Sequence, residues 1–202
     1  MPFDVSNYLA KCQASLDEGF GKPRDYLLGR GLTKTTIQKY LLGYDASRDA
    51  IVIPYLNALL DVRKLRYRNL SSDPKYIWGS DGEKGAHLFR VAATRKPRLW
   101  MTEGEFDAML LSQMGFPAVA VPGAKMFKAE WKYLFAYCEQ LTVVFDNDVK
   151  ADGSNPGLEG AQRVGGILGP MVSQFRMVRL PAGQDVSDLY KSDRAMLEGL
   201  VK

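Results

Sequence analysis

The chain has 202 residues, of which 46% are hydrophobic and 25% are charged, and its formal net charge is +4. These values are ordinary for a globular chain that buries a full core. Neither a run of about 18 apolar residues nor the apolar segment of a secretory signal is present, so a membrane-spanning or exported protein is not expected. Cys12 and Cys138 are far apart and only one histidine exists, so we expect free thiols and no four-ligand zinc site.

The first half of the chain mixes helices with strands. Apolar spacing and turn residues predict helices over residues 7–19, 23–28 and 34–42. They predict strands over residues 50–55 and 61–69. Thr33 is the expected N-cap of the third helix. Pro54 indicates that the first strand ends there or lies at the edge of a sheet.

After Pro97 strands and helices alternate. We expect strands at 98–101, 118–121, 141–145 and 175–180, and helices at 105–114, 128–138, 158–168 and 186–200. This alternation predicts βαβ units and a parallel sheet flanked by helices. The expected fold class is therefore α/β, with a small mixed α/β basic lobe over residues 1–96, a parallel-sheet domain over residues 97–202, and an active site between them.

Charge is distributed unevenly along the chain. From Arg63 to Arg98 there are ten Lys or Arg and only three Asp or Glu, whereas acidic residues gather at 103–107, 146–152 and 185–188. Cations can hold phosphates, and carboxylates can hold a metal ion. A basic stretch followed by acidic clusters therefore predicts a nucleic-acid enzyme.

Each acidic cluster follows a predicted strand. Glu103, Asp146 and Asp148 would converge at the carboxyl ends of parallel strands, where α/β sheets place their sites. Converging carboxylates repel one another unless a divalent cation lies among them, and hard oxygen ligands suit Mg²⁺ or Mn²⁺. Favourable placement at a helix N-terminus is an alternative for Glu103, and helix capping is one for Asp185.

A calcium-binding loop is a further alternative for the second cluster. Asp148, Asp152, Gly153 and Glu159 have the spacing of EF-hand positions one, five, six and twelve. Lys150 occupies the third position, where an acid or amide is required, and a strand rather than a helix precedes the loop. The EF-hand is therefore the weaker interpretation.

Four motifs in the second half resemble a known domain. They read E-G-x-x-D at 103–107, V-P-G-A at 121–124, V-V-F-D-N-D at 143–148 and L-P-x-G-x-D at 180–185. In this order they resemble the Toprim domain, which DnaG-type primases share with topoisomerases, some nucleases and recombination proteins. The resemblance extends from Arg98 to about Tyr190.

The first half resembles the DnaG-type primases in particular. Residues 26–43 resemble the stretch ahead of their catalytic core, and residues 53–55 with 65–68 resemble a strand pair whose second strand carries arginines. Asp73-Pro74-Lys75-Tyr76 resembles their P-K-Y signature. The resemblance thus covers nearly the whole chain.

This resemblance implies a DNA-dependent RNA primase core that uses Mg²⁺ or Mn²⁺ and no zinc. Glu103, Asp146 and Asp148 would be catalytic and hold the metal, with Asp107, Asp185 and Asp188 in support. Nucleotide and template phosphates would be bound by Arg66, Arg68, Lys75 and Lys84. Tyr67, Tyr76 and Trp78 alternate with these cations, so they either stack on bases or, the favoured interpretation, pack in the core.

The chain departs from the family at both ends. Members normally have a zinc-binding domain before the core and a helicase or helicase-binding domain after it. We therefore expect a reduced core, phage-encoded and located in the host cytoplasm, with no membrane association. Its expected partners are single-stranded DNA, nucleoside triphosphates, a replicative helicase and a separate zinc-binding module. A Toprim nuclease and a nucleic-acid-binding subunit without activity of its own remain alternatives.

Overall fold

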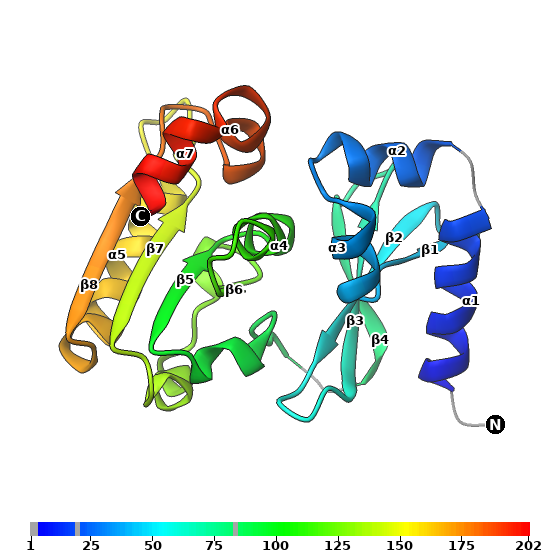
Figure 1. Cartoon of the computed structure of the whole chain (residues 1–202), viewed down its shortest axis with the longest axis horizontal. Helices are drawn as coiled ribbons and strands as arrows, with labels where there is room; N and C mark the ends of the chain where they lie inside the picture. The colour runs from blue at the N-terminus through cyan, green and yellow to red at the C-terminus, as the bar shows by residue number, and fades with distance from the viewer. Residues whose placement is uncertain (1–3, 19–20, 83–84) are drawn as a thin grey trace. The chain divides into compact units, whose positions relative to one another are not determined.

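The computed structural model describes residues 4–18, 21–82 and 85–202. The chain divides into two compact units, Met1–Gly85 and Ala86–Lys202 (Figure 1). This division comes about ten residues before the boundary expected near Arg95–Pro97, because Phe89 already pairs with Ala120 of the second sheet.

The first unit contains an antiparallel sheet in the order β1-β2-β3-β4. Its elements are α1 (Val5–Glu18), α2 (Lys22–Gly29), α3 (Lys34–Lys39), β1 (Gly43–Asp45), β2 (Ala50–Leu56), β3 (Val62–Asn69) and β4 (Tyr76–Gly82). The helices and strands predicted here are confirmed, as is the Thr33 cap, whose hydroxyl accepts from the Thr36 N–H at 3.2 Å. β1 and β4 were not predicted, since one is short and the other is rich in turn-forming residues.

The position of Pro54 agrees with its sequence-based interpretation. β1 pairs with β2 only as far as Val52, so at Pro54 the strand β2 has a neighbour on one side, where Pro54 pairs with Leu65 of β3. A residue without an N–H group is tolerated at such a position.

Alternation along β3 gives the first sheet two different faces. Leu65 and Tyr67 pack with Leu9 and Cys12 of α1 in a hydrophobic core. Because successive side chains of a strand point to opposite faces, Arg66 and Arg68 lie on the other face. Tyr67 is thus a core residue, as favoured from the sequence.

The second unit contains a parallel sheet in the order β6-β5-β7-β8. Its strands are β5 (Arg98–Thr102), β6 (Ala118–Ala120), β7 (Gln140–Phe145) and β8 (Gln174–Arg179). Its helices are η1 (Val91–Arg95), α4 (Glu105–Gln113), η2 (Ala124–Met126), η3 (Ala129–Phe135), α5 (Pro156–Leu168), η4 (Gly169–Met171), α6 (Val186–Ser192) and α7 (Arg194–Val201).

The predicted parallel sheet and its flanking helices are therefore confirmed. Two segments differ from expectation: residues 129–135 form a 3₁₀-helix instead of an α-helix, and the last helix is divided at Asp193, whose side chain caps α7 by accepting from the Met196 N–H. No helix in the described ranges combines the length and apolar character that a membrane span requires.

Candidate active site

Two of the three acidic clusters follow the central strands β5 and β7 of the parallel sheet, and the third follows the edge strand β8. The chain leaves β5 through α4 to reach β6 on one side, and leaves β7 through α5 to reach β8 on the other (Figure 1). The strand order therefore reverses between β5 and β7. Open α/β sheets bind ligands in the crevice at this switch point, and Glu103 and Asp146 are the first residues after these two strands.

Asp146 lies at the centre of the acidic group. Burial raises the pKa of its carboxyl, and the nearby charges of Glu103, Asp185, Asp148 and Asp188 raise it further, to about 7. An ionised carboxylate in this position lacks compensating positive charge among these neighbours. The structure therefore brings five of the predicted acidic residues into electrostatic contact.

Glu103 is held in place by a backbone group. Burial raises the pKa of its carboxyl, and the charge of Asp148 also raises it. A hydrogen bond from the Ala124 N–H and the charge of Lys150 act in the opposite direction. The V-P-G-A segment thus positions Glu103, a role that the sequence did not reveal.

The remaining members of the group differ in exposure. Asp148 is exposed, and its carboxylate lies 4.0 Å from the ammonium group of Lys150. Asp185 and Asp188 form a capping box at the start of α6, in which the Asp185 carboxylate accepts from the Asp188 N–H at 2.7 Å. Capping of α6 by Asp185, the alternative considered from the sequence, is therefore real and coexists with its effect on Asp146.

Asp107 is directed elsewhere. It is buried on the first turn of α4, and one of its oxygens accepts from the backbone N–H and the hydroxyl of Ser187, at 3.2 and 3.3 Å. These bonds connect α4 to α6. Asp107 is not among the residues that raise the pKa of Asp146, so its contribution to metal binding stays a prediction.

Two asparagines and a glycine support the site and were not identified from the sequence. The Asn147 amide donates to the Leu180 carbonyl at 2.6 Å and accepts from Asn155 at 2.8 Å, which connects the ends of β7 and β8 to the start of α5. A Cβ on Gly157 would lie 2.0 Å from the carbonyl oxygen of Asp146. Only glycine therefore lets α5 approach Asp146 so closely.

The donor set of the acidic group fits a hard divalent cation, because every candidate ligand is a carboxylate oxygen. Across residues 4–18, 21–82 and 85–202, no three Asp, Glu, His or Cys side chains converge closely enough to form a ready coordination sphere. The half-buried Asp146 nonetheless has four acidic neighbours that raise its pKa. A dication would remove this repulsion.

The geometry does not favour the calcium loop. Glu159, its required twelfth-position ligand, lies on α5 and pairs with Lys125 at 3.4 Å. The Asp152 carboxylate instead accepts from the backbone N–H and hydroxyl of Ser154.

A row of cations and aromatic rings lies on the second face of the first sheet. The Arg66 guanidinium lies 4.4 Å from the ring centre of Tyr76 and 5.1 Å from that of Trp78. Arg68 lies 5.0 Å from the ring centre of Tyr76, and its Nε donates to the Tyr26 hydroxyl at 2.8 Å. These contacts orient both guanidinium groups.

The other predicted cations are Lys75 and Lys84. Lys75 is exposed, and Lys84 lies outside the described residues. Tyr76 and Trp78 are half-buried and pack against the arginines. Phosphate binding by these cations stays a prediction.

Comparison with known protein sequences gives a matching family model and several similar proteins. A family model described as Toprim-like matches residues 100–190. The Gene 57 protein of Mycobacterium phage D29 is 34% identical over 151 residues, which are 72% of this chain and 92% of the phage protein. The DNA primase of Rickettsia typhi is 22% identical over 220 residues, which cover 85% of this chain and 36% of the primase. The chain thus spans about a third of the length of that bacterial relative.

Solved structures of primases share the fold. The Aquifex aeolicus primase, with its zinc-binding and RNA polymerase domains, has a TM-score of 0.77 at 18% identity, covering 96% of this chain and 59% of that one. A DnaG primase catalytic domain bound to single-stranded DNA has a TM-score of 0.78 at 20% identity, covering 98% of this chain and 76% of that one. The primase fragment of the bacteriophage T7 primase-helicase has a TM-score of 0.66 at 21% identity, covering 87% of this chain and 73% of that one.

Proposed function

The chain belongs to the family of Toprim-containing catalytic cores of DnaG-type primases, and from that premise we propose that it is a DNA-dependent RNA primase core. It would join nucleoside triphosphates into short primers on single-stranded DNA. The observation that carries the proposal is the acidic group around Asp146, whose pKa is raised to about 7 at the switch point of the parallel sheet.

The acidic group would hold Mg²⁺ or Mn²⁺ through Glu103, Asp146 and Asp148, with Asp185 and Asp188 nearby. Such a cation, when bound, would lower the pKa of an attacking 3′-hydroxyl and neutralise charge on the triphosphate. The chain itself would position the carboxylates: the Ala124 N–H binds Glu103, and Asn147 holds the end of β7 beside Asp146. Asp107 would act indirectly, by holding α6 through Ser187.

The first unit would supply phosphate binding. Arg66 and Arg68 carry guanidinium groups oriented by aromatic rings, and a guanidinium can bind a phosphate through two parallel hydrogen bonds. Lys75 and Lys84 would add positive charge. These residues would bind the template strand and the incoming nucleotide.

The proposed partners follow from the same function. Single-stranded DNA and nucleoside triphosphates are the substrates, and a replicative helicase and a separate zinc-binding module are proposed partner proteins. The likeness to a phage protein supports a phage-encoded enzyme that acts in the host cytoplasm.

The test is primer synthesis by the purified chain. It would be incubated with single-stranded DNA, labelled nucleoside triphosphates and Mg²⁺ or Mn²⁺, and the products separated on a sequencing gel. We expect new labelled oligonucleotides whose yield falls at least about 1000-fold in Asp146→Asn. Asp152→Asn, an exposed change on the following loop, is the matched control and should keep full activity.

Two results would contradict the proposal. Synthesis by Asp146→Asn at the wild-type rate would exclude this carboxylate from catalysis. Shortened template without new product would identify a nuclease that uses the same acidic group.

A further inference from the structure

The parallel sheet has a polar area at the end opposite to Asp146. On the face that α7 covers, two successive rows cross the sheet: Arg98, Gln140 and Gln174 form the first, and Trp100, Thr142 and Arg176 form the second. The last turn of α7 lies over the second row, where the Val201 carbonyl accepts from the Trp100 indole at 2.9 Å and from Arg176 at 2.8 Å. The first row is left accessible, with Arg98 and Gln174 exposed.

A cavity of about 160 Å³ lies over these rows. Arg98, Arg176 and Lys202 bring positive charge to its wall, Gln140, Thr142 and Gln174 bring neutral donors, and no carboxylate side chain lines it within the described residues. Glu198, which pairs with Lys202 at 3.5 Å, also pairs with Arg194 at 3.3 Å. The cavity is thus lined by hydrogen-bond donors with an excess of positive charge.

This composition is unusual for its position. Parallel sheets are normally covered on both faces and lined by apolar side chains, yet here the accessible row is Arg-Gln-Gln. The cavity is smaller than a pocket for a drug-sized ligand, which needs roughly 300 Å³ or more. Two arginines that can form paired hydrogen bonds suit a phosphate group.

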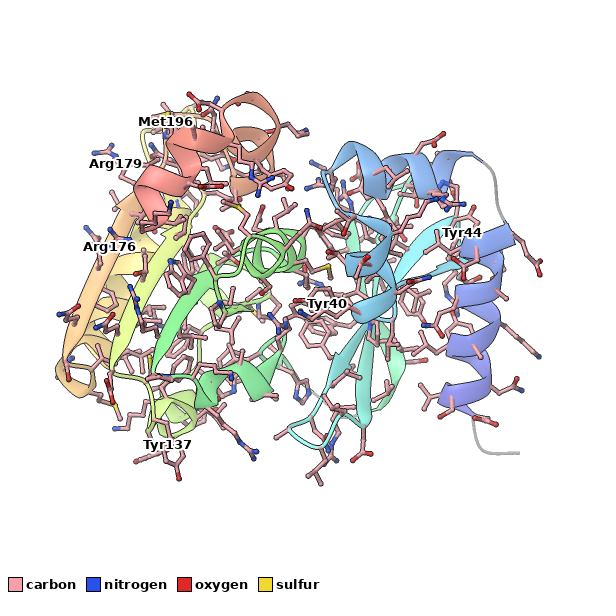
Figure 2. All side chains as sticks on the ribbon, viewed as in Figure 1. Tyr40, Tyr44, Tyr137, Arg176, Arg179 and Met196 are labelled. Atoms are coloured by element: carbon pink, nitrogen blue, oxygen red, sulfur yellow. The ribbon has the colours of Figure 1, made fainter. Side chains whose placement is uncertain are left out.

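We infer that this cavity, lined by Arg98, Arg176 and Lys202, binds a phosphate group of a nucleic-acid strand, at a site separate from the acidic group. The choice of nucleic acid as the source of the phosphate rests on the proposed function. Along β7, Asp146 lies about 13 Å beyond Thr142 and about 20 Å beyond Gln140, the two residues of this strand that mark the two rows, so a strand bound here extends beyond the reacting atoms. Arg176 and Arg179 are both exposed on the edge strand β8 (Figure 2), and of the two only Arg176 lines this cavity.

The test is the salt dependence of DNA binding by the whole chain. Binding of a labelled single-stranded oligonucleotide of about 16 nucleotides would be followed by fluorescence anisotropy over a range of salt concentrations. Arg98→Gln should weaken binding about five-fold and reduce the slope of log affinity against log salt by about 0.7, the value for one lost phosphate contact. Arg163→Gln, which removes one exposed positive charge from α5 on the other face of the sheet, is the matched control and should lose much less DNA affinity.

A second variant and two alternative ligands complete the test. Arg176→Gln should behave like Arg98→Gln, with its thermal unfolding midpoint measured because Arg176 also contacts α7. If Arg98→Gln and Arg163→Gln weaken binding equally, the inference is wrong. If inorganic phosphate or a nucleoside triphosphate alone binds the wild type as tightly as the oligonucleotide does, and Arg98→Gln abolishes that binding, the phosphate comes from a small molecule and the strand is excluded.

Failure of this inference is distinguishable from failure of the proposed function. A chain that makes primers while Arg98→Gln binds DNA like the wild type would refute only the inference. A chain that makes no primers while Arg98→Gln selectively weakens DNA binding would refute only the proposed function. Arg98→Gln should weaken DNA binding by the same factor in the Asp146→Asn background as in the wild type, since the two sites lie at opposite ends of the sheet.

Discussion

Two aspartates, the buried Asp45 of the first unit and the half-buried Asp146 of the second, experience opposite environments. Asp45 accepts hydrogen bonds from the Tyr8 hydroxyl and from Arg48, both at 2.6 Å, and from the hydroxyl of Ser47 at 2.6 Å. Burial alone would raise its pKa, but the hydrogen bonds outweigh burial and lower the pKa to about 2. At Asp146, burial and four acidic neighbours act together and raise the pKa to about 7.

The difference separates a structural carboxylate from a functional one. Asp45 has its donors within the chain, so its charge is already compensated and connects α1, β1 and the following turn. Asp146 is surrounded by groups that make its charge less favourable, an arrangement that costs stability unless a cation is bound. A raised pKa, in a carboxyl group at the switch point of the parallel sheet, therefore indicates the functional site.

A larger side chain at Gly157 should have the largest effect, and it tests the functional role of Asp146 in this comparison. In Gly157→Ala the new Cβ would meet the Asp146 carbonyl oxygen at 2.0 Å, so α5 or the end of β7 must shift. We expect primer synthesis to fall about 100-fold, since a displacement of roughly 1 Å at a catalytic group has that effect. Gly166→Ala in the same helix meets nothing within 4 Å and should leave the rate unchanged; equal rates for the two variants would refute the role of Gly157.

Removal of the charge at Asp45 tests the structural side. Asp45→Asn should lower the free energy of unfolding of the first unit by about 3 kcal/mol, because charge-assisted bonds from Tyr8 and Arg48 are lost at a buried position. Urea unfolding, followed by a signal from this unit, measures the change. Asp17→Asn on the exposed side of α1 is the control and should change stability by less than about 0.5 kcal/mol.

The pH dependence of stability distinguishes the two aspartates by sign. The pKa of Asp146 lies above its unfolded value of 3.8, so its contribution to stability is complete below that value and is lost as the pH rises through about 7. Without metal, Asp146→Asn should therefore match the wild type near pH 4 and exceed its stability by up to about 4 kcal/mol above pH 7. The contribution of Asp45 has the opposite course: it is present above its unfolded pKa and is lost as the pH falls through about 2.

Thermal unfolding in the presence of a chelator, for both proteins over this pH range, provides the check. A constant difference between Asp146→Asn and the wild type at all pH values would mean that Asp146 does not titrate in this range. Added Mg²⁺ should reduce the difference above pH 7, because the cation compensates the charge that only the wild type carries.

The sequence predicted the parallel sheet because its signals were local. Short apolar runs such as Leu141–Phe145 alternate with amphipathic helices, and each strand's end was marked by acids or glycine. β4 was missed because Tyr76–Gly82 contains glycine, serine and aspartate, which are typical of turns; its pairing with the arginine-bearing β3 is a long-range property.

The acidic residues of the candidate site could be named from the sequence, whereas the residues that support them could not. Glu103, Asp146 and Asp148 could be named because they directly follow strands. The direction of Asp107 toward Ser187 could not, since residues 80 positions apart meet only through the packing of α4 on α6. Likewise, the sequence shows only that Asn147 stands between two acids, and the fold shows that it binds the Leu180 carbonyl.

The most direct test of the central claim, that the like-charged group around Asp146 is a metal-binding centre, is Mn²⁺ binding followed by electron paramagnetic resonance at neutral pH. The wild type and Asp45→Asn should bind Mn²⁺ with the same affinity, whereas Asp146→Asn should bind it at least about ten-fold more weakly. Equal affinity in Asp146→Asn and the wild type would contradict the claim and leave the raised pKa of Asp146 without a functional explanation.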